Sequence, residues 1–199
     1  MCGCFFWKRK KCKEVEEELN ISEFSFDDSL EGDIRPGASP IIIAQNNRLS
    51  VNDKKDIEVK NMIWGYPSKD NKLIINARAE SVLEKPLFYE GIRKNRCVIP
   101  AVSFYEWNKD KIKVSFSKID NSLFYLAGFY LTKGNNCYFV ILTTKANNSV
   151  ILTHHRMPLF LEPNLVRVWI CGNNPESFLN LQMPELVTNQ SCKQLTLWN

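Results

Sequence analysis

Three apolar runs decide the fold of this 199-residue chain: IKVSFS at 112–117, FYLAGFY at 124–130 and CYFVILT at 137–143. Each run is rich in aromatic or β-branched residues, which favour the pleated, half-buried surface of a sheet. The segments between the runs contain Asn, Asp and Gly, the residues that tight turns prefer. The three runs therefore predict consecutive antiparallel strands.

Similar segments extend this pattern in both directions along the chain. Strands are expected at 1–7, 40–44, 58–64, 73–76, 97–100, 103–107 and 193–197. Helices are expected at 8–20, 163–169 and 175–181, and a further helix begins at Ser81, is interrupted at Pro86 and resumes over 87–94. Ser81 and Glu84 have the spacing of a capping box at the start of one helix. Clustered strands with a few short helices predict an antiparallel, strand-rich α+β fold. Without an evident linker or internal repeat, residues 1–199 are expected to form one domain.

Composition limits the class of protein. Hydrophobic residues make up 44% and charged residues 24% of the chain, as in ordinary globular proteins. The net charge of +4 permits an anionic partner without demanding one. Because no apolar run reaches the ~18 residues of a membrane span, no membrane partner is expected.

The seven cysteines are an odd number without Cys-x-x-Cys spacing, which supports neither a disulfide framework nor a zinc ribbon. A reducing cytoplasm fits them best. Two alternatives concern Cys2, Cys4 and Cys12, which could bind a metal or carry a palmitoyl group beside the basic run at 8–13. Acidic residues follow that run closely, which disfavours a membrane tether. We expect neither a metal nor a cofactor.

The amino-terminal sequence MCGC, residues 1–4, offers a particular chemistry. The Cys2 side chain is small, so removal of Met1 after synthesis is expected. Removal would leave an α-amine and a thiol two carbons apart, with ordinary pKa values of about 8 and about 8.5. Such an aminothiol can attack an aldehyde twice, first through nitrogen and then through sulfur, to close a five-membered thiazolidine.

Four polar segments interrupt the apolar runs and could carry chemistry. They are DIRP at 33–36, NARAE at 76–80, FYEW at 104–107 and THHRMP at 153–158. On a strand, Asn76 and Arg78 share one face and could hold an anion such as a phosphate. Glu106 is either solvated or held in an aromatic cleft, where its raised pKa would suit proton transfer. His154 and His155, the only histidines, are either surface residues or proton carriers.

These segments occur in the order and spacing of the SRAP (SOS response-associated peptidase) family, which the chain resembles from Cys2 to about Trp169. The motifs that carry the resemblance are MCG at 1–3, WGY at 64–66, INARAE at 75–80, RCVIPA at 96–101, FYEW at 104–107, ILTTK at 141–145 and HxRMP at 154–158. The resemblance implies a barrel-like core with short flanking helices. It also implies a thiazolidine crosslink to the ring-opened aldehyde of abasic sites in single-stranded DNA, which shields the lesion, and autocatalytic exposure of the cysteine.

The resemblance further implies roles for individual residues. Cys2 would be the nucleophile, and Glu106 and His154 would move protons. Residues implied to hold the DNA backbone are Asn76, Arg78, Thr143 and Arg156. The likeness implies a monomer that acts on DNA without a metal, in the cytoplasm and at the nucleoid when bound to DNA.

Two positions depart from the family's pattern. Cys4 replaces an arginine that usually contacts phosphate, so one cation is lost. Asp33 stands where an asparagine is usual; its carboxylate would repel phosphate but could support the site by accepting a hydrogen bond from the Cys2 amine. These departures leave two rivals to a crosslinking enzyme. One is a single-stranded DNA binding module with weak crosslinking, and the other is a cysteine peptidase acting in trans.

Overall fold

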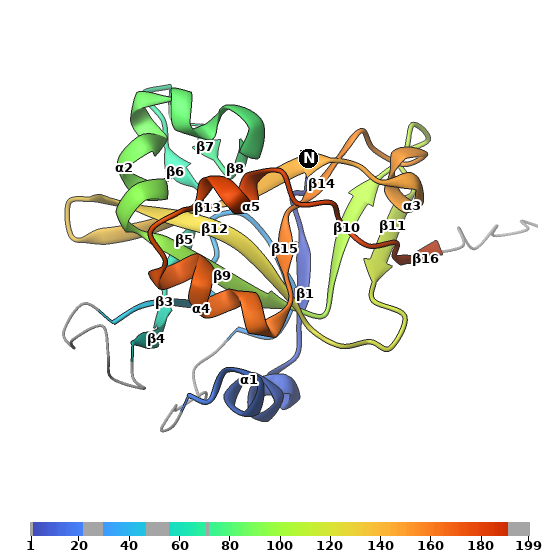
Figure 1. Ribbon diagram of the computed structural model, residues 1–199. Coiled ribbons are helices and arrows are strands. Elements are labelled where there is room, and N and C mark those ends of the chain that lie inside the picture. Colours follow the sequence, from blue (N-terminus) through green and yellow to red (C-terminus); the bar gives the residue numbers. More distant parts are fainter. Residues whose placement is uncertain (1, 22–29, 47–55, 71, 191–199) are drawn as a thin grey trace, which may run out of the picture.

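The computed structural model describes residues 2–21, 30–46, 56–70 and 72–190, and its architecture is α+β (Figure 1). The described strands form two larger sheets and one small two-stranded sheet, with short helices around them. This confirms the predicted fold class. The strand predicted at 193–197 lies outside the described residues.

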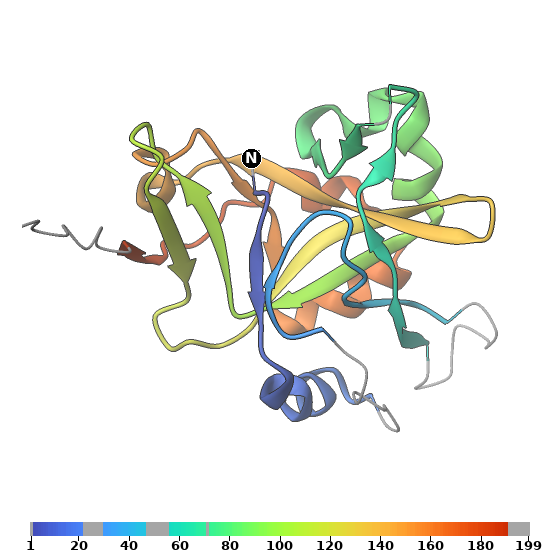
Figure 2. The ribbon, with the colours of Figure 1, turned by 180° about the vertical axis from the view of Figure 1, so that it is seen from behind.

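The five-stranded sheet contains the amino-terminal strand β1. Its order is β16–β11–β10–β1–β2, and the bounds are Val187–Gln190, Lys113–Ser117, Ser103–Trp107, Phe5–Trp7 and Gly32–Ile34. All its neighbours are antiparallel. In Figure 2, β1 runs between β10 on one side and the chain of β2 on the other. The residues before β1 are therefore held inside the sheet and not at its edge.

Whereas the run at 112–117 forms β11 of the five-stranded sheet, the larger sheet contains the strands predicted from the runs at 124–130 and 137–143. Its main order is β14–β13–β12–β9–β3–β4, with bounds Arg156–Pro158, Asn136–Lys145, Phe124–Lys133, Arg96–Ala101, Ile41–Gln45 and Ile57–Asn61. Three short strands join it: β15 (Phe160–Leu161) pairs with β12, and β5 (Ile63–Trp64) and β8 (Asn76–Arg78) pair with β13. The last two pairings are parallel. A separate small sheet pairs β6 (Tyr66–Pro67) with β7 (Leu73–Ile74).

The helices are short and lie around the sheets (Figure 1). Their bounds are Arg9–Lys11 (η1), Cys12–Leu19 (α1), Ala79–Glu84 (η2), Pro86–Lys94 (α2), Asn148–Ile151 (α3), Pro163–Cys171 (α4) and Glu176–Leu179 (α5). The capping box predicted at Ser81 is wrong, because Ser81 lies inside the 3-10 helix η2 and α2 begins with Pro86 at its first turn. No helix in the described ranges is long and apolar enough to cross a membrane.

Close packing in the larger sheet depends on Gly128 of β12. A Cβ atom there would lie 2.7 Å from the backbone oxygen of Val140 on the paired strand β13. Glycine alone lets the two backbones approach this closely. The neighbouring strand β9 is buried along its whole length, which explains its nearly continuous apolar sequence.

Aromatic side chains join the two sheets beneath the amino terminus. The ring of Phe5 on β1 lies 5.2 Å from that of Trp64, which stacks on Phe139 with ring centroids 6.1 Å apart. All three side chains are fully buried. Packing of Phe5 against the larger sheet therefore fixes β1, and with it the position of Cys2.

Candidate active site

The amino-terminal segment enters the interior, where Cys2, Cys4 and Phe5 are buried. The backbone N–H of Tyr105 donates to the Cys4 carbonyl at 3.0 Å, and that of Val102 donates to Phe6 at 2.8 Å. Cys2 has no exposed surface, and its thiol lies 3.6 Å from the Cys4 carbonyl oxygen, which accepts from it. Backbone pairing with β10 thus holds Cys2 at a defined place.

Asn76 anchors Cys2 from the other sheet. Its side-chain Nδ2 donates to the Cys2 carbonyl oxygen at 2.8 Å. Asn76 itself is fixed by β8, which runs parallel to β13 with Asn76 across from Ile141. The Oδ1 atom of Asn76 is buried and has no hydrogen-bond partner among the described residues. An acceptor of this kind beside Cys2 is suited to receive an N–H donor.

Glu106 is buried and not solvated, which were the two alternatives for this side chain in the sequence. It shares the inward face of β10 with Phe104, and only 2% of its surface is exposed. Burial raises the pKa of the carboxyl from 4.5 to about 7, while the positive charge of the amino terminus acts in the opposite direction. A carboxyl with this pKa can both donate and accept a proton near neutrality.

His154 lies beside this carboxyl. Its Nδ1 atom is 3.9 Å from Oε1 of Glu106, and the backbone N–H of Arg156 donates to Nδ1 at 3.0 Å. Nδ1 also lies 3.1 Å from the Arg156 carbonyl oxygen, so whether it accepts from or donates to the Arg156 backbone depends on the tautomer of the ring. Burial lowers the pKa of His154 below 6.5, so the neutral ring dominates at neutral pH. The exposed His155 packs against it, with ring centroids 4.4 Å apart.

The Cys2 thiol is protonated in this environment. Burial raises its pKa, and the nearby negative charge of Glu106 raises it further. A thiol of raised pKa is a weak nucleophile until a base removes its proton. The position of Glu106 near Cys2 provides such a base.

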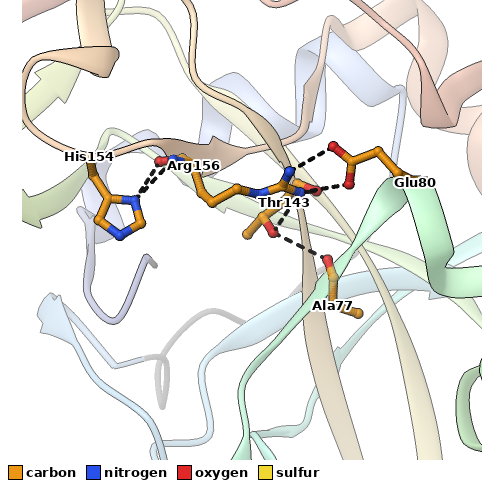
Figure 3. A network of polar contacts seen from close by, with 5 residues as sticks. All are labelled: Ala77, Glu80, Thr143, His154 and Arg156. Carbon is orange, nitrogen blue, oxygen red and sulfur yellow. Dashed lines mark hydrogen bonds and ion pairs between the residues drawn. The ribbon is translucent and has the colours of Figure 1, made fainter.

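Arg156 and Thr143 form a buried network behind the histidine (Figure 3). The Arg156 guanidinium donates to both carboxylate oxygens of Glu80, at 2.7 and 2.8 Å, and to the Thr143 carbonyl at 2.6 Å. The Thr143 hydroxyl lies 3.4 Å from the Ala77 carbonyl oxygen. The hydrogen bonds from Arg156 lower the pKa of Glu80.

This network does not favour the direct DNA contacts that the resemblance implied for two residues. Thr143 has no exposed surface and Arg156 has 7%, with its charge already paired to Glu80. We propose that both residues position the strand β14 and the backbone that fixes His154. Sequence reasoning missed Glu80 as their partner, although it lies in the same short motif as Asn76 and Arg78.

Arg78, by contrast, is exposed at the end of β8. It borders a cavity of about 260 Å³. The lining residues are Asn76, Ala77, Arg78, Ser81, Val82, Lys85 and Phe88. Arg78 and Lys85 are the two cations of this lining, and Asn76 in the same lining donates to the Cys2 carbonyl.

Asp33 lies close to Cys4, whose pKa is raised by burial and further by this carboxylate. It is paired with Phe6 in the β1–β2 register, and its carboxylate accepts from Lys113 Nζ at 2.6 Å. Burial alone would raise the pKa of Asp33, but hydrogen bonds from Lys113 and Tyr105 outweigh it and lower the pKa. The predicted hydrogen bond from the Cys2 amine has no support in this geometry.

The alternative sites at Cys2, Cys4 and Cys12 involve three buried side chains. An acyl chain attached to any of these three thiols would not reach the protein surface in this fold. In the described part of the chain, no group of three or more His, Cys, Asp or Glu side chains could hold a metal ion.

Comparison with known proteins places this geometry in context. A family model described as SOS response associated peptidase (SRAP) matches residues 1–197. Abasic site processing protein YoqW of Bacillus subtilis (strain 168) is 34% identical over 201 residues, which cover 92% of this chain and 87% of the relative. Abasic site processing protein YedK of Escherichia coli (strain K12) is 25% identical over 146 residues, 69% of this chain and 63% of the relative.

Solved structures agree on the fold. A protein from Bordetella bronchiseptica superposes with a TM-score of 0.77 at 20% identity, covering 96% of this chain and 99% of the other. The family model spans nearly the whole chain, and the motifs around Cys2, Asn76, Glu106 and His154 meet at one buried site. The chain therefore belongs to the SOS response associated peptidase (SRAP) family.

Proposed function

We propose that this protein processes abasic sites in single-stranded DNA by forming a thiazolidine between Cys2 and the ring-opened sugar aldehyde. The observation that carries the proposal is the convergence of Asn76 and Glu106 on Cys2, the residue that gains an α-amine when Met1 is removed. The names of the relatives as abasic site processing proteins support the choice of substrate.

The first step exposes the amine. While Met1 is attached, the Cys2 nitrogen is part of a peptide bond and cannot attack a carbonyl. Hydrolysis of that bond consumes one water and releases methionine. The new amine belongs to the residue whose carbonyl accepts from Asn76 Nδ2. The buried Oδ1 of the same side chain, which has no partner among the described residues, would accept from the amine and orient its lone pair toward the substrate.

The amine then attacks the aldehyde carbon. A C–N bond forms, the carbonyl oxygen takes a proton, and a carbinolamine results. Glu106, with its pKa of about 7, donates a proton to the carbinolamine hydroxyl, which leaves as water while the nitrogen lone pair forms the C=N bond. His154, 3.9 Å from Glu106, would carry the earlier proton from the attacking amine nitrogen to the carbonyl oxygen as the carbinolamine forms, so Glu106 remains a carboxylate after water leaves.

Sulfur closes the ring. The nitrogen keeps its remaining proton in the C=N bond, the Glu106 carboxylate accepts the thiol proton of Cys2, and the sulfur adds to the carbon of this protonated imine. Amine, aldehyde and thiol thus give one thiazolidine and one water. Since no C=N bond remains, the product resists hydrolysis. Protection of the DNA strand from cleavage would follow from this stability.

DNA binding is assigned to the exposed rim. Arg78 and Lys85 border the cavity next to Asn76, and their charges suit phosphates on either side of the lesion. Such contacts position a strand without reading its bases, which fits a lesion that has no base. Arg156 and Thr143 act indirectly, by fixing the loop that carries His154.

A cysteine peptidase acting in trans would use the same thiol. Its cleavage of a peptide needs the Cys2 thiolate, as ring closure does, but makes no use of the Cys2 amine that removal of Met1 exposes. A DNA-binding module with weak crosslinking differs from our proposal only in its reaction rate.

One assay separates the three. Purified protein is incubated with an abasic oligonucleotide, with an intact oligonucleotide and with a peptide substrate, and the first two are run on a denaturing gel. We expect an adduct with abasic DNA only and no cleaved peptide, from protein whose intact mass lacks Met1. Binding without an adduct would indicate the binding module, and peptide cleavage that requires Cys2 would indicate the peptidase.

A further inference from the structure

A group of charged side chains surrounds Cys4 on β1, two residues from the nucleophile. The Cys4 thiol is fully buried, and the groups that act on its pKa, after burial itself, are Asp33, Lys113 and Arg35. Asp33 and Lys113 are joined by the 2.6 Å ion pair, and Lys113 Nζ also lies 3.6 Å from the centre of the Tyr105 ring. Lys113 is therefore held in place by two contacts and largely neutralised by one.

Arg35 is the remaining charge of this group. It is exposed, and among the residues that the structure describes no carboxylate forms an ion pair with it. Two cations, Arg35 and Lys113, face one carboxylate, Asp33, which leaves one net positive charge. An exposed cation without a partner retains its full attraction for an anion.

The backbone at Arg35 is fixed. Phe5 is paired with Ile34 and Phe6 with Asp33, so the same antiparallel register carried one residue further places Arg35 across from Cys4. Arg35 also begins a Pro-Gly turn in which Ala38 N–H donates to the Arg35 carbonyl at 3.1 Å and Gly37 has φ +88°. The strand pairing and the turn together fix the position of the Arg35 Cα and Cβ atoms.

The distance between Arg35 and Cys2 along the sheet suits a DNA strand whose abasic sugar is bonded to Cys2 and whose neighbouring phosphate meets Arg35. Two residues of extended chain separate Cys4 from Cys2, a span of roughly 7 Å. An arginine side chain across from Cys4 can therefore reach an anion next to a group bonded to Cys2. Guanidinium groups bind phosphate oxygens through paired hydrogen bonds.

We infer that Arg35 holds a backbone phosphate of the DNA strand beside the abasic nucleotide, and that Asp33 weakens this contact by placing a negative charge next to it. Arg35, which directly follows β2, supplies the cation that position 4 of this chain lacks. The inference deepens the proposed function and rests on it for the identity of the anion. It also assigns Asp33 a role in binding strength and none in the chemistry of the amine.

The test measures the affinity for an intact single-stranded oligonucleotide at several salt concentrations, and in parallel the rate of adduct formation with abasic DNA. The variants are Arg35→Gln, Arg35→Lys and Asp33→Asn. Lys10→Gln is the matched control, because Lys10 is an exposed cation on η1, which follows β1 at the end away from Cys2. Melting temperatures establish that all four variants are folded.

Arg35→Gln should lower the salt slope of log K by about 0.7 and weaken binding roughly fivefold at about 0.1 M salt. Arg35→Lys should keep the slope, and Asp33→Asn should tighten binding and steepen it. Lys10→Gln should match the wild type. The inference is overturned if Arg35→Gln binds like Lys10→Gln, or if Asp33→Asn weakens binding.

The two readouts separate this inference from the proposed function. A wild-type protein that forms the adduct while Arg35→Gln changes neither slope nor affinity would overturn the role of Arg35 alone. A wild-type protein that binds DNA through Arg35 but forms no adduct would overturn the crosslinking chemistry alone. A wild-type protein that neither binds nor crosslinks would overturn both.

Discussion

Two groups at the site, the Cys2 thiol and the Glu106 carboxyl, both tend to keep their protons near neutral pH. Burial raises the pKa of each, and in the case of Glu106 to about 7. If both were ionised, two negative charges would share one buried place. The protonated carboxyl is suited to expel water first, and the carboxylate that it leaves behind is suited to activate sulfur afterwards.

The rate of adduct formation should therefore depend on Glu106. Glu106→Gln is expected to slow the reaction by ~10²–10⁴-fold without weakening DNA binding, because amide cannot exchange a proton. The wild-type rate should also fall as pH rises through about 7, where the carboxyl loses its proton. Single-turnover rates between about pH 5 and about pH 9 measure both effects. An unchanged rate and an unchanged pH profile in the variant would remove Glu106 from the chemistry.

The same pKa shift has a consequence for stability. The Glu106 pKa is raised from 4.5 to about 7 by folding, so the stability it contributes is fully present below 4.5 and is lost as pH rises through 7. The free energy of unfolding of Glu106→Gln, relative to that of the wild type, should therefore be higher at about pH 8 than at about pH 4. The expected increase is on the order of 1–3 kcal/mol. Urea unfolding at both pH values measures this, with the exposed Glu90→Gln as control. If the variant and the wild type differed in stability by the same amount at both pH values, the raised pKa of Glu106 would be contradicted.

At the level of elements, the Arg156–Glu80 pair connects β14 to η2 across β13. Because Arg156 is buried and also donates to the Thr143 carbonyl, its loss leaves several acceptors without a donor. Arg156→Ala should lower the free energy of unfolding by about 1–3 kcal/mol, a figure reduced because a third of the Glu80 side chain is exposed. Urea unfolding beside Lys94→Ala, which removes an exposed pair with Glu90, is the measurement. If Arg156→Ala were as stable as Lys94→Ala and its DNA binding had a lower salt slope, Arg156 would instead be a phosphate contact.

Arg78, on the exposed end of β8, should behave in the opposite way. Arg78→Ala is expected to leave stability nearly unchanged and to weaken binding of intact and abasic strands alike. The salt slope of log K should fall by about 0.7, the value for one phosphate contact on a single strand. Affinity titrations at several salt concentrations measure it. Normal binding together with complete loss of the adduct would show that Arg78 acts in the chemistry instead.

The secondary structure near the centre of the chain follows from composition, and its limits come from tertiary contacts. The runs at 124–130 and 137–143 predict two strands, which in the structure extend to Phe124–Lys133 and Asn136–Lys145 around a turn with Gly134 at φ +59°. The polar residues at these ends form strand because the hairpin pairs them. Ser81 fails as a cap for a related reason: packing holds residues Ala79–Glu84 in a 3-10 helix before Pro86 starts α2.

At the scale of the whole molecule, the sequence could propose residues for the site but could not predict which side chains surround each of them. Glu106 could have faced either way on a strand, and its burial depends on the larger sheet packed against Phe104 and Phe5. Arg156 reads as an exposed cation next to a histidine, and only the folded chain brings it to Glu80, 76 residues earlier. Pairing across such separations has no local signal in a sequence.

The central claim is that Cys2 supplies both nitrogen and sulfur to one ring, while the neighbouring Cys4 supplies neither. The Cys4 nitrogen is in a peptide bond, and its thiol is buried beside Asp33 and Lys113. In Cys2→Ser the amine survives, but a hydroxyl is a weak nucleophile without an activating base, so the reaction should stop at the imine. An imine reverses in water and is fixed only by borohydride.

The most direct measurement is a denaturing gel of abasic oligonucleotide with wild type, Cys2→Ser and Cys4→Ser, each with and without borohydride. Wild type and Cys4→Ser should give a heat-stable adduct in both conditions, and Cys2→Ser should give one only with borohydride. A heat-stable adduct from Cys2→Ser without reductant, or none from folded Cys4→Ser, would show that another nucleophile carries the chemistry.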